Sequence, residues 1–367
     1  NPQGSALRVM RMDRRWFPAM RCVRDDRLGE WPCRDLAAGP PAPAPEPATA
    51  SFVRESDKNL RRIAPSLVLV NFDMPYTIAG VADRHYYGTG LVVDAERGYV
   101  VVDRNTVPEA MGDVRITFAG SVEVSGKVEF VHPLHNLTLL SYDPALVGET
   151  PVRSAQLGSR QPIPAEELTA VGLRKDSQLV SQTARVASID PVAFPLSRTM
   201  RFRDTNLETL SLVNPPRDFD GVLLDGRGKV AALWSSFAYE SGKDVFQENK
   251  GILADQVAEM LAIVAGGKNL YSLEAELTQT PLSVARNLGL SDQWIQRLED
   301  ADPERRQMLA VARTVAGTRT AELLQVGDLL LSIDGVPVTR FREVERAVQK
   351  SEVDVSVWRN REQLTFT

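Results

Sequence analysis

The chain has 367 residues, of which 43% are hydrophobic and 25% are charged, and its formal net charge is −5. This length allows two or three domains that each bury a core, and the composition is ordinary for a soluble globular protein. The negative charge gives no reason to expect nucleic acid or an anionic membrane as a partner, and no apolar run approaches the roughly 20 residues of a membrane-spanning helix.

Residues 1–36 are rich in Arg and contain three aromatic residues, Trp16, Phe17 and Trp31. They predict an N-terminal arm or a short β segment, because they have too little apolar sequence for an independent core. The chain opens without Met, and residues 1–20 lack the uncharged apolar core of a signal peptide. We therefore expect a piece of a longer protein, and the preference for Arg over Lys suggests a bacterial source.

The only two cysteines, Cys22 and Cys33, flank a short segment with turn-forming residues. Such a turn can bring them together across a hairpin. A disulfide would suit an oxidising compartment, and a periplasmic location is the expectation that goes with it. Two unpaired thiols in a cytosolic protein are the alternative. A zinc site is not expected, since neither cysteine has another Cys or a His at ligand spacing.

Residues 37–63 predict a linker, because Pro and Ala dominate its first half. After it, short runs rich in Val, Leu and Ile alternate with Gly, Pro, Asp and Asn, which predicts many short strands. These strands are expected at 66–70, 90–94, 99–102, 114–118, 122–131 and 137–142, then at 167–172, 183–189, 208–213, 221–225 and 229–234. No helical pattern separates them, so two consecutive sets of about six strands predict two barrels side by side.

The last part of the chain mixes both types of element. A helix is expected at 252–265, where Gly266 and Gly267 end it. Beyond it we expect strands at 270–277, 308–315, within 323–337, and at 353–359 and 363–366, with helices at 281–288, 291–299 and 341–350. This mixture predicts a separate α+β domain at 267–367.

Four segments carry a family resemblance. They are Gly-Thr-Gly-Leu-Val at 88–92, Gly-Tyr-Val-Val-Val-Asp-Arg-Asn-Thr-Val at 98–107, His-Pro-Leu-His-Asn-Leu-Thr-Leu-Leu at 132–140 and Asn-Pro-Pro-Arg-Asp-Phe-Asp-Gly-Val-Leu at 214–223. In this order and spacing they resemble the HtrA/Deg family of serine proteases. The resemblance implies a mostly β fold, with a trypsin-like double β-barrel of two six-stranded antiparallel barrels at 64–266 and a PDZ domain at 267–367. The pattern is most similar to the second, degenerate half of tandem HtrA proteins.

The resemblance also implies that the catalytic residues are missing. It places the general base at Asn105, the group that orients the base at Asn136, and the nucleophile at Asp218 or Phe219. An Asn side chain accepts no proton near neutral pH, and a Phe side chain has no nucleophilic atom. No Ser, Thr or Cys occurs between Ser211 and Ser235 that could replace the nucleophile. We therefore expect no catalytic residues, and a pseudoprotease instead of an enzyme.

The glycines that pose an oxyanion hole in the family are replaced as well, by Pro216 and Arg217. Other polar residues offer no substitute site. We expect His85, His132 and His135 to be surface or loop-packing residues, and Ser235 and Ser236 to be hydroxyls that cap a strand end. No cofactor and no metal site are expected.

The implied PDZ domain offers a second site. In this family a backbone loop holds the carboxylate of a bound C-terminus, which here would be Leu270, Tyr271, Ser272 and Leu273. The helix that faces this loop would contribute Val344, Ala347 and Val348. Ser272 stands where the family has Gly, which puts capture of the carboxylate in doubt. A packed edge strand, or a groove that is filled by another part of the same protein, is the alternative.

Three functions follow from these features. The first is a catalytically inactive, HtrA-like scaffold that binds peptides or protein C-termini, or that supports a catalytic protease half elsewhere in its parent chain. The second is an active serine-type endopeptidase, a quality-control protease with a non-standard site between the barrels. The third is a structural unit that forms a homo-oligomer and has an occluded PDZ groove. We favour the first, because the fold is expected to be intact while the reacting groups are lost.

Overall fold

The computed structural model describes residues 21–22, 33–34, 45–74, 84–196 and 202–367, and the chain forms two units, 1–46 and 47–367. In the first unit β1 (Arg21–Cys22) and β2 (Cys33–Arg34) pair antiparallel, with the backbone of Cys22 opposite that of Cys33. The disulfide between them stays a prediction. The rest of the expected arm lies outside the described residues.

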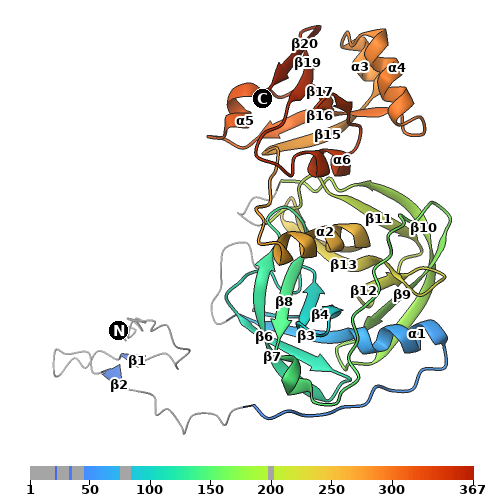
Figure 1. Ribbon diagram of the computed structural model, residues 1–367, viewed down its shortest axis with the longest axis vertical. Helices are drawn as coiled ribbons and strands as arrows, with labels where there is room; N and C mark the ends of the chain where they lie inside the picture. Colours follow the sequence, from blue (N-terminus) through green and yellow to red (C-terminus); the bar gives the residue numbers. More distant parts are fainter. Residues whose placement is uncertain (1–20, 23–32, 35–44, 75–83, 197–201) are drawn as a thin grey trace. The chain divides into compact units, whose positions relative to one another are not determined.

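Two closed, six-stranded antiparallel barrels make up most of the second unit (Figure 1), which confirms the predicted fold class. The first barrel has the order β3-β4-β5-β8-β7-β6, and the second has β10-β11-β14-β13-β12-β9. The strands are β3 (Leu67–Asp73), β4 (His85–Asp94), β5 (Tyr99–Val102), β6 (Asp113–Phe118), β7 (Val122–Val131), β8 (Thr138–Tyr142), β9 (Glu167–Leu173), β10 (Leu179–Pro191), β11 (Glu208–Val213), β12 (Gly221–Leu224), β13 (Val230–Ser241) and β14 (Asp244–Leu253).

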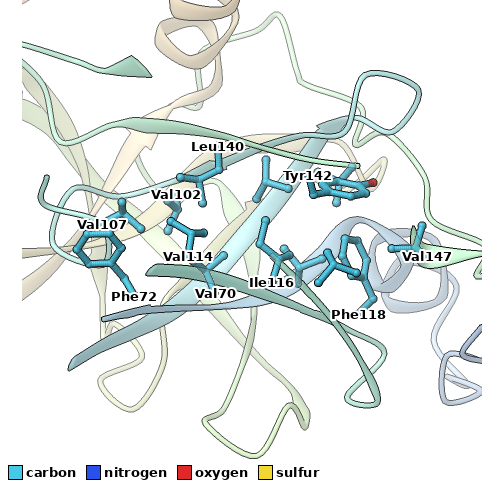
Figure 2. Packing of buried hydrophobic residues seen from close by; sticks show 14 of the residues in the cluster. Val70, Phe72, Val102, Val107, Val114, Ile116, Phe118, Leu140, Tyr142 and Val147 are labelled. Atoms are coloured by element: carbon cyan, nitrogen blue, oxygen red, sulfur yellow. The ribbon is translucent and has the colours of Figure 1, made fainter. Parts of the chain in front are cut away.

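Alternating apolar residues fill each barrel. In β6 Val114, Ile116 and Phe118 are buried while the residues between them are more exposed, as a strand with one face on a core requires. Figure 2 shows these three side chains in the core of the first barrel, together with Phe72 and Tyr142. The rings of Phe118 and Tyr142 lie 4.8 Å apart in a tilted arrangement. The alternation in β6 therefore corresponds to a strand with one face on the core.

The sequence did not predict β14. We expected a helix from residue 252, whereas α2 (Ala254–Ala265) begins only after β14 has ended at Leu253. The first seven residues of β14 are exposed or half-buried, since they pair with the end of β13 in a hairpin, with Ser241 opposite Asp244. A strand without a buried face lacks the alternation from which strands are predicted.

The segment predicted as a linker carries structure at its end. The N–H of Ala48 donates to the C=O of Leu146 at 3.0 Å, and the N–H of Ala50 donates to Thr150 Oγ1 at 2.9 Å. A short helix, α1 (Lys58–Ile63), then starts behind its N-cap Asp57 and leads through a 3₁₀ turn, η1 (Ala64–Ser66), into β3. A second 3₁₀ turn, η2 (Pro144–Val147), follows β8. This end of the segment is thus bound to the first barrel.

A mixed α/β region completes the second unit, in orange and red in Figure 1. Its sheet has the order β15-β16-β17-β19-β20, with β18 paired to β17, so that β15 is an edge strand. The elements are β15 (Ala275–Pro281), α3 (Leu282–Asn287), α4 (Asp292–Ala301), β16 (Gln307–Thr314), α5 (Arg319–Leu323), β17 (Leu329–Ile333), β18 (Val336–Pro337), α6 (Phe341–Ala347), β19 (Val355–Arg359) and β20 (Glu362–Phe366). Among the described residues, no helix is both long and apolar enough to cross a lipid bilayer.

Candidate functional site

A cleft of about 1120 Å³ separates the two barrels, and it contains all four positions at which the family resemblance places catalytic residues. Asn105 follows β5, Asn136 precedes β8, and Asp218 and Phe219 precede β12. The structure therefore brings together residues that are more than 100 positions apart in the sequence. Ser236, on β13, lies in the same cleft.

Ser236 is the centre of a network of amide side chains. Its hydroxyl oxygen accepts one hydrogen bond from Asn105 Nδ2 at 2.8 Å and another from Gln247 Nε2 at 2.5 Å. Its C=O accepts a hydrogen bond from Asn136 Nδ2 at 2.7 Å, and its N–H donates to Asp103 Oδ2 at 2.9 Å. The residues that stand for the base and its orienter thus both hold Ser236 in place.

This network also fixes the turn after β5. Asn136 is buried, and its Oδ1 accepts the N–H of Arg104 at 2.8 Å. Asp103 Oδ1 accepts the N–H of Thr106 at 2.7 Å, which closes an Asx-type turn. Asn136 therefore satisfies two backbone groups on different elements, one on the turn and one on β13.

The loop that would carry the nucleophile is tied to the first barrel. Asp220 Oδ1 accepts the N–H of Thr89 at 3.0 Å, and the C=O of Asp220 accepts the Thr89 hydroxyl at 3.1 Å. Phe219 packs against the core of the second barrel, and its C=O accepts Asn249 Nδ2 at 3.2 Å. Asp218 is exposed. The aromatic ring thus serves packing at this position.

Two carboxyl groups at the junction of the barrels have raised pKa values. Burial raises the pKa of Asp103. Burial, and in second place the charge of Asp103, raises the pKa of Asp220 to about 7. No local pattern in the sequence indicates this pair, since the two residues lie on different barrels. The two carboxyl groups affect each other because the fold places them close together at the junction of the barrels.

The geometry limits the chemistry that these residues can perform. An amide has no basic nitrogen, so Asn105 donates a hydrogen bond to the Ser236 hydroxyl instead of taking its proton. The hydrogen bonds from Asn105 and from Gln247 both use the Ser236 hydroxyl oxygen as the acceptor. The arrangement is that of a polar network which holds two barrels together. No group of three His, Cys, Asp or Glu residues able to hold a metal ion occurs within the described ranges.

The expectation for Ser235 and Ser236 was wrong, whereas the three histidines are surface or loop-packing residues as we expected. Ser236 lies inside β13 and does not cap the end of a strand. His132 and His135 are buried, with stacked rings 4.5 Å apart, and burial lowers the pKa of His132 well below its usual value. His135 Nε2 lies 2.7 Å from Glu345 Oε1, a partner from α6 that sequence spacing did not reveal. His85 is exposed and pairs with Asp73.

The second candidate site is a cavity of about 800 Å³ beside β15 and α6. It contains the predicted loop residues Leu270, Tyr271, Ser272 and Leu273, together with Val344 and Val348. The two valines are buried in the core of the sheet, and Leu273 packs against the same core. The strand starts later than we expected, at Ala275, so 270–274 form a loop.

Three hydrogen bonds organise the loop that lines this cavity. Gln349, just after α6, accepts the N–H of Tyr271 at 3.2 Å and donates to the C=O of Tyr271 at 2.8 Å. The Ser272 hydroxyl accepts the N–H of Glu274 at 2.9 Å. The residue that replaces the family's Gly therefore fixes the loop through its side chain.

The cavity is bounded on one side by the second barrel. Arg342 and Arg346 of α6 form ion pairs with Glu259 of α2, and Arg346 also pairs with Asp255. Burial raises the pKa of Asp204, in the loop before β11, to about 7. The C-terminal region thus contacts the barrels through charged side chains.

Comparisons with known proteins agree with this fold. The chain is 35% identical to "Pro-apoptotic serine protease nma111" of Aspergillus clavatus and 33% identical to the protein of the same name from Phaeosphaeria nodorum. These alignments cover 97% and 98% of this chain, but the chain spans only 36% of the length of either curated relative. No family model matches the chain.

Solved structures show the same architecture at lower sequence identity. The HtrA-type protease AlgW with a tripeptide superposes with a TM-score of 0.57 at 16% identity, over 84% of this chain and 93% of that chain. The structure of AlgW with a decapeptide gives 0.54 at 14% identity, over 84% and 95%. At this level of identity the likeness concerns the fold alone.

Proposed function

We propose that this chain, a relative of the HtrA/Nma111-type serine proteases, is a non-catalytic unit that binds the C-terminal ends of proteins. In this proposal the double barrel is a scaffold that supports a catalytic half of the parent protein. The observation that carries the proposal is the network around Ser236, in which Asn105 and Asn136 hold a serine without offering it a base.

The cavity beside β15 supports the binding part of the proposal. It combines an apolar floor, made by Val344 and Val348, with a loop of backbone N–H groups. Lys268, at the start of this loop, is exposed and has no ion pair with any of the described residues. A free ammonium group, open N–H groups and an apolar pocket match a carboxylate and the side chain beside it.

The scaffolding part rests on the relatives. They carry the name of serine proteases and are almost three times as long as this chain. A working protease in the remaining length would make the present unit an auxiliary one. Association into homo-oligomers and a periplasmic location stay predictions, as does the boundary between the barrel domain and the PDZ domain.

Two measurements test the proposal. Purified chain should show no labelling by a fluorophosphonate and no turnover of unfolded casein, with trypsin as the positive control. The same preparation should bind peptides that end in an apolar residue with a free carboxylate. Binding should be lost when the C-terminal carboxylate of these peptides is amidated. Labelling of any serine, or equal binding of the amidated peptides, would contradict it.

An endopeptidase with a non-standard site is the second candidate, because Asp220 lies in the cleft with a pKa of about 7. A carboxyl group of this pKa can exchange protons near neutral pH. Casein turnover that is lost in Asp220→Asn but kept in Asp218→Asn, an exposed neighbour, would establish this candidate and displace the first.

A further inference from the structure

One side chain of the second barrel occupies the free edge of β15. Asn206, in the loop before β11, donates from Nδ2 to the C=O of Ala275 at 2.8 Å. Its Oδ1 accepts the N–H of Leu277 at 2.9 Å. The opposite edge of β15 is paired with β16, so these two groups belong to the edge that an added strand would use.

The contact imitates a β-ladder. A residue of an added strand offers one N–H and one C=O to the edge, and the side-chain amide of Asn206 offers the same pair. Glu276, between the two bonded residues, forms a two-pronged ion pair with Arg203 at 3.0 and 2.6 Å. Both members of this ion pair are less than a quarter exposed.

The loop is built to hold Asn206 in this place. Asn206 has a φ of 52°, in the left-handed region that Asn tolerates better than most residues. The N–H of the preceding Thr205 donates to the C=O of Leu134 in the first barrel at 3.1 Å. A contact with the first barrel therefore helps to hold this loop of the second barrel in place beside β15.

The part of the cavity before Ala275 is open. The loop residues Ser272 and Leu273 line the cavity, and no hydrogen bond of their backbone N–H groups to another described residue is observed. A chain that entered at this loop and ran along β15 would reach Asn206 after about two residues, at about 3.3 Å per residue.

We propose that this groove binds only the last two or three residues of a C-terminus, and that Asn206 prevents the strand addition by which longer peptides gain affinity. The inference rests on the proposed peptide-binding function. The partner is a protein with a free C-terminal carboxylate and an apolar residue at the C-terminus or just before it. The apolar floor of the cavity suits that side chain, and Lys268, which has no ion pair with any of the described residues, suits the carboxylate.

The test compares peptide lengths on the whole chain. Peptides of three and ten residues, each with a free carboxylate and with Val, Leu, Ile or Phe as last residue, are titrated by fluorescence anisotropy. In the unchanged protein the dissociation constants of the two lengths should agree within about threefold. In Asn206→Ala the ten-residue peptide should bind about tenfold more tightly than the three-residue one, because two backbone groups become free to pair.

Two further variants make the outcome specific. Asn206→Asp keeps the acceptor for Leu277 but loses the donor to Ala275, and should give an intermediate length dependence. Asn287→Ala, an exposed amide on α3, should behave as the unchanged protein.

The outcomes separate the two proposals. Tight binding of long peptides to the unchanged protein would overturn the role of Asn206 while leaving the peptide-binding function intact. Binding to Asn206→Ala alone would show that the groove is closed even to short ends, which also contradicts this inference. No binding by any variant would refute the peptide-binding function itself.

Discussion

Amide side chains lie in both the cleft between the barrels and the groove beside β15, with different consequences. In the cleft Asn105 and Asn136 stand in the positions of reacting groups and bond to Ser236. In the groove Asn206 bonds to backbone groups and leaves the neighbouring loop open. Asn105 and Asn136 thus offer no base in the first site, whereas in our proposal Asn206 restricts the length of the ligand in the second.

This comparison implies that the amide side chains in the cleft are structural. The substitution with the largest expected effect tests this. Asn136→Ala should lower the free energy of unfolding by about 2 to 4 kcal/mol, because it leaves the N–H of Arg104 and the C=O of Ser236 without partners in a buried place. Urea denaturation gives this difference. Asn105→Ala is the matched control and should lower it by only about 1 kcal/mol, since it removes a single bond to a hydroxyl.

Equal and small effects of the two substitutions would contradict a structural role for Asn136. The cleft would then be better explained as a ligand site that has kept its polar groups for binding.

Much of the fold could be predicted from the sequence, and the reason is local. Val114, Ile116 and Phe118 alternate with more exposed residues, so β6 is visible in the sequence itself. The beginning of β14 has no such alternation, because it pairs in an exposed hairpin. Local patterns reveal strands with a buried face and miss strands that lack one.

The sites were less predictable, because their contacts join distant segments. The family resemblance located Asn105 and Asn136, but nothing in the sequence around Ser236 shows that both bond to it from about 130 and 100 residues away. Asn206 lies 69 residues before Ala275 in the chain, so its contact with β15 has no local signal. A groove filled by another part of the protein was one of the alternatives, and the residue that fills its edge became visible only in three dimensions.

A second prediction concerns the charge at the junction of the barrels. Asp220 has a pKa of about 7 in the folded protein and near 3.8 in an unfolded chain. Between these values the folded protein keeps a proton that the unfolded chain releases, so this group makes stability fall as pH rises from about 4 to 7. Asp220→Asn removes the effect, because an amide stays neutral.

Measured by urea denaturation, Asp220→Asn should therefore gain stability over the unchanged protein on going from pH 4.5 to pH 8, by about 2 to 3 kcal/mol. Asp218→Asn, which changes an exposed neighbour, should run parallel to the unchanged protein. Parallel curves for Asp220→Asn as well would mean that the carboxyl group titrates as in the unfolded chain, and would remove the argument for proton exchange by Asp220.

The smallest effect is expected in the groove. Gln349 takes up the N–H of Tyr271, a loop group that would otherwise be free to donate to a bound carboxylate. Gln349→Ala should tighten the binding of three-residue peptides by about two- to tenfold, the range that corresponds to one neutral hydrogen bond. Gln349→Glu should weaken it, because a fixed carboxylate would compete for the same N–H and repel the ligand. Weaker binding by both variants would show instead that Gln349 holds the loop in its binding shape, so that the amides of the groove would be as structural as those of the cleft and the contrast between the two sites would disappear.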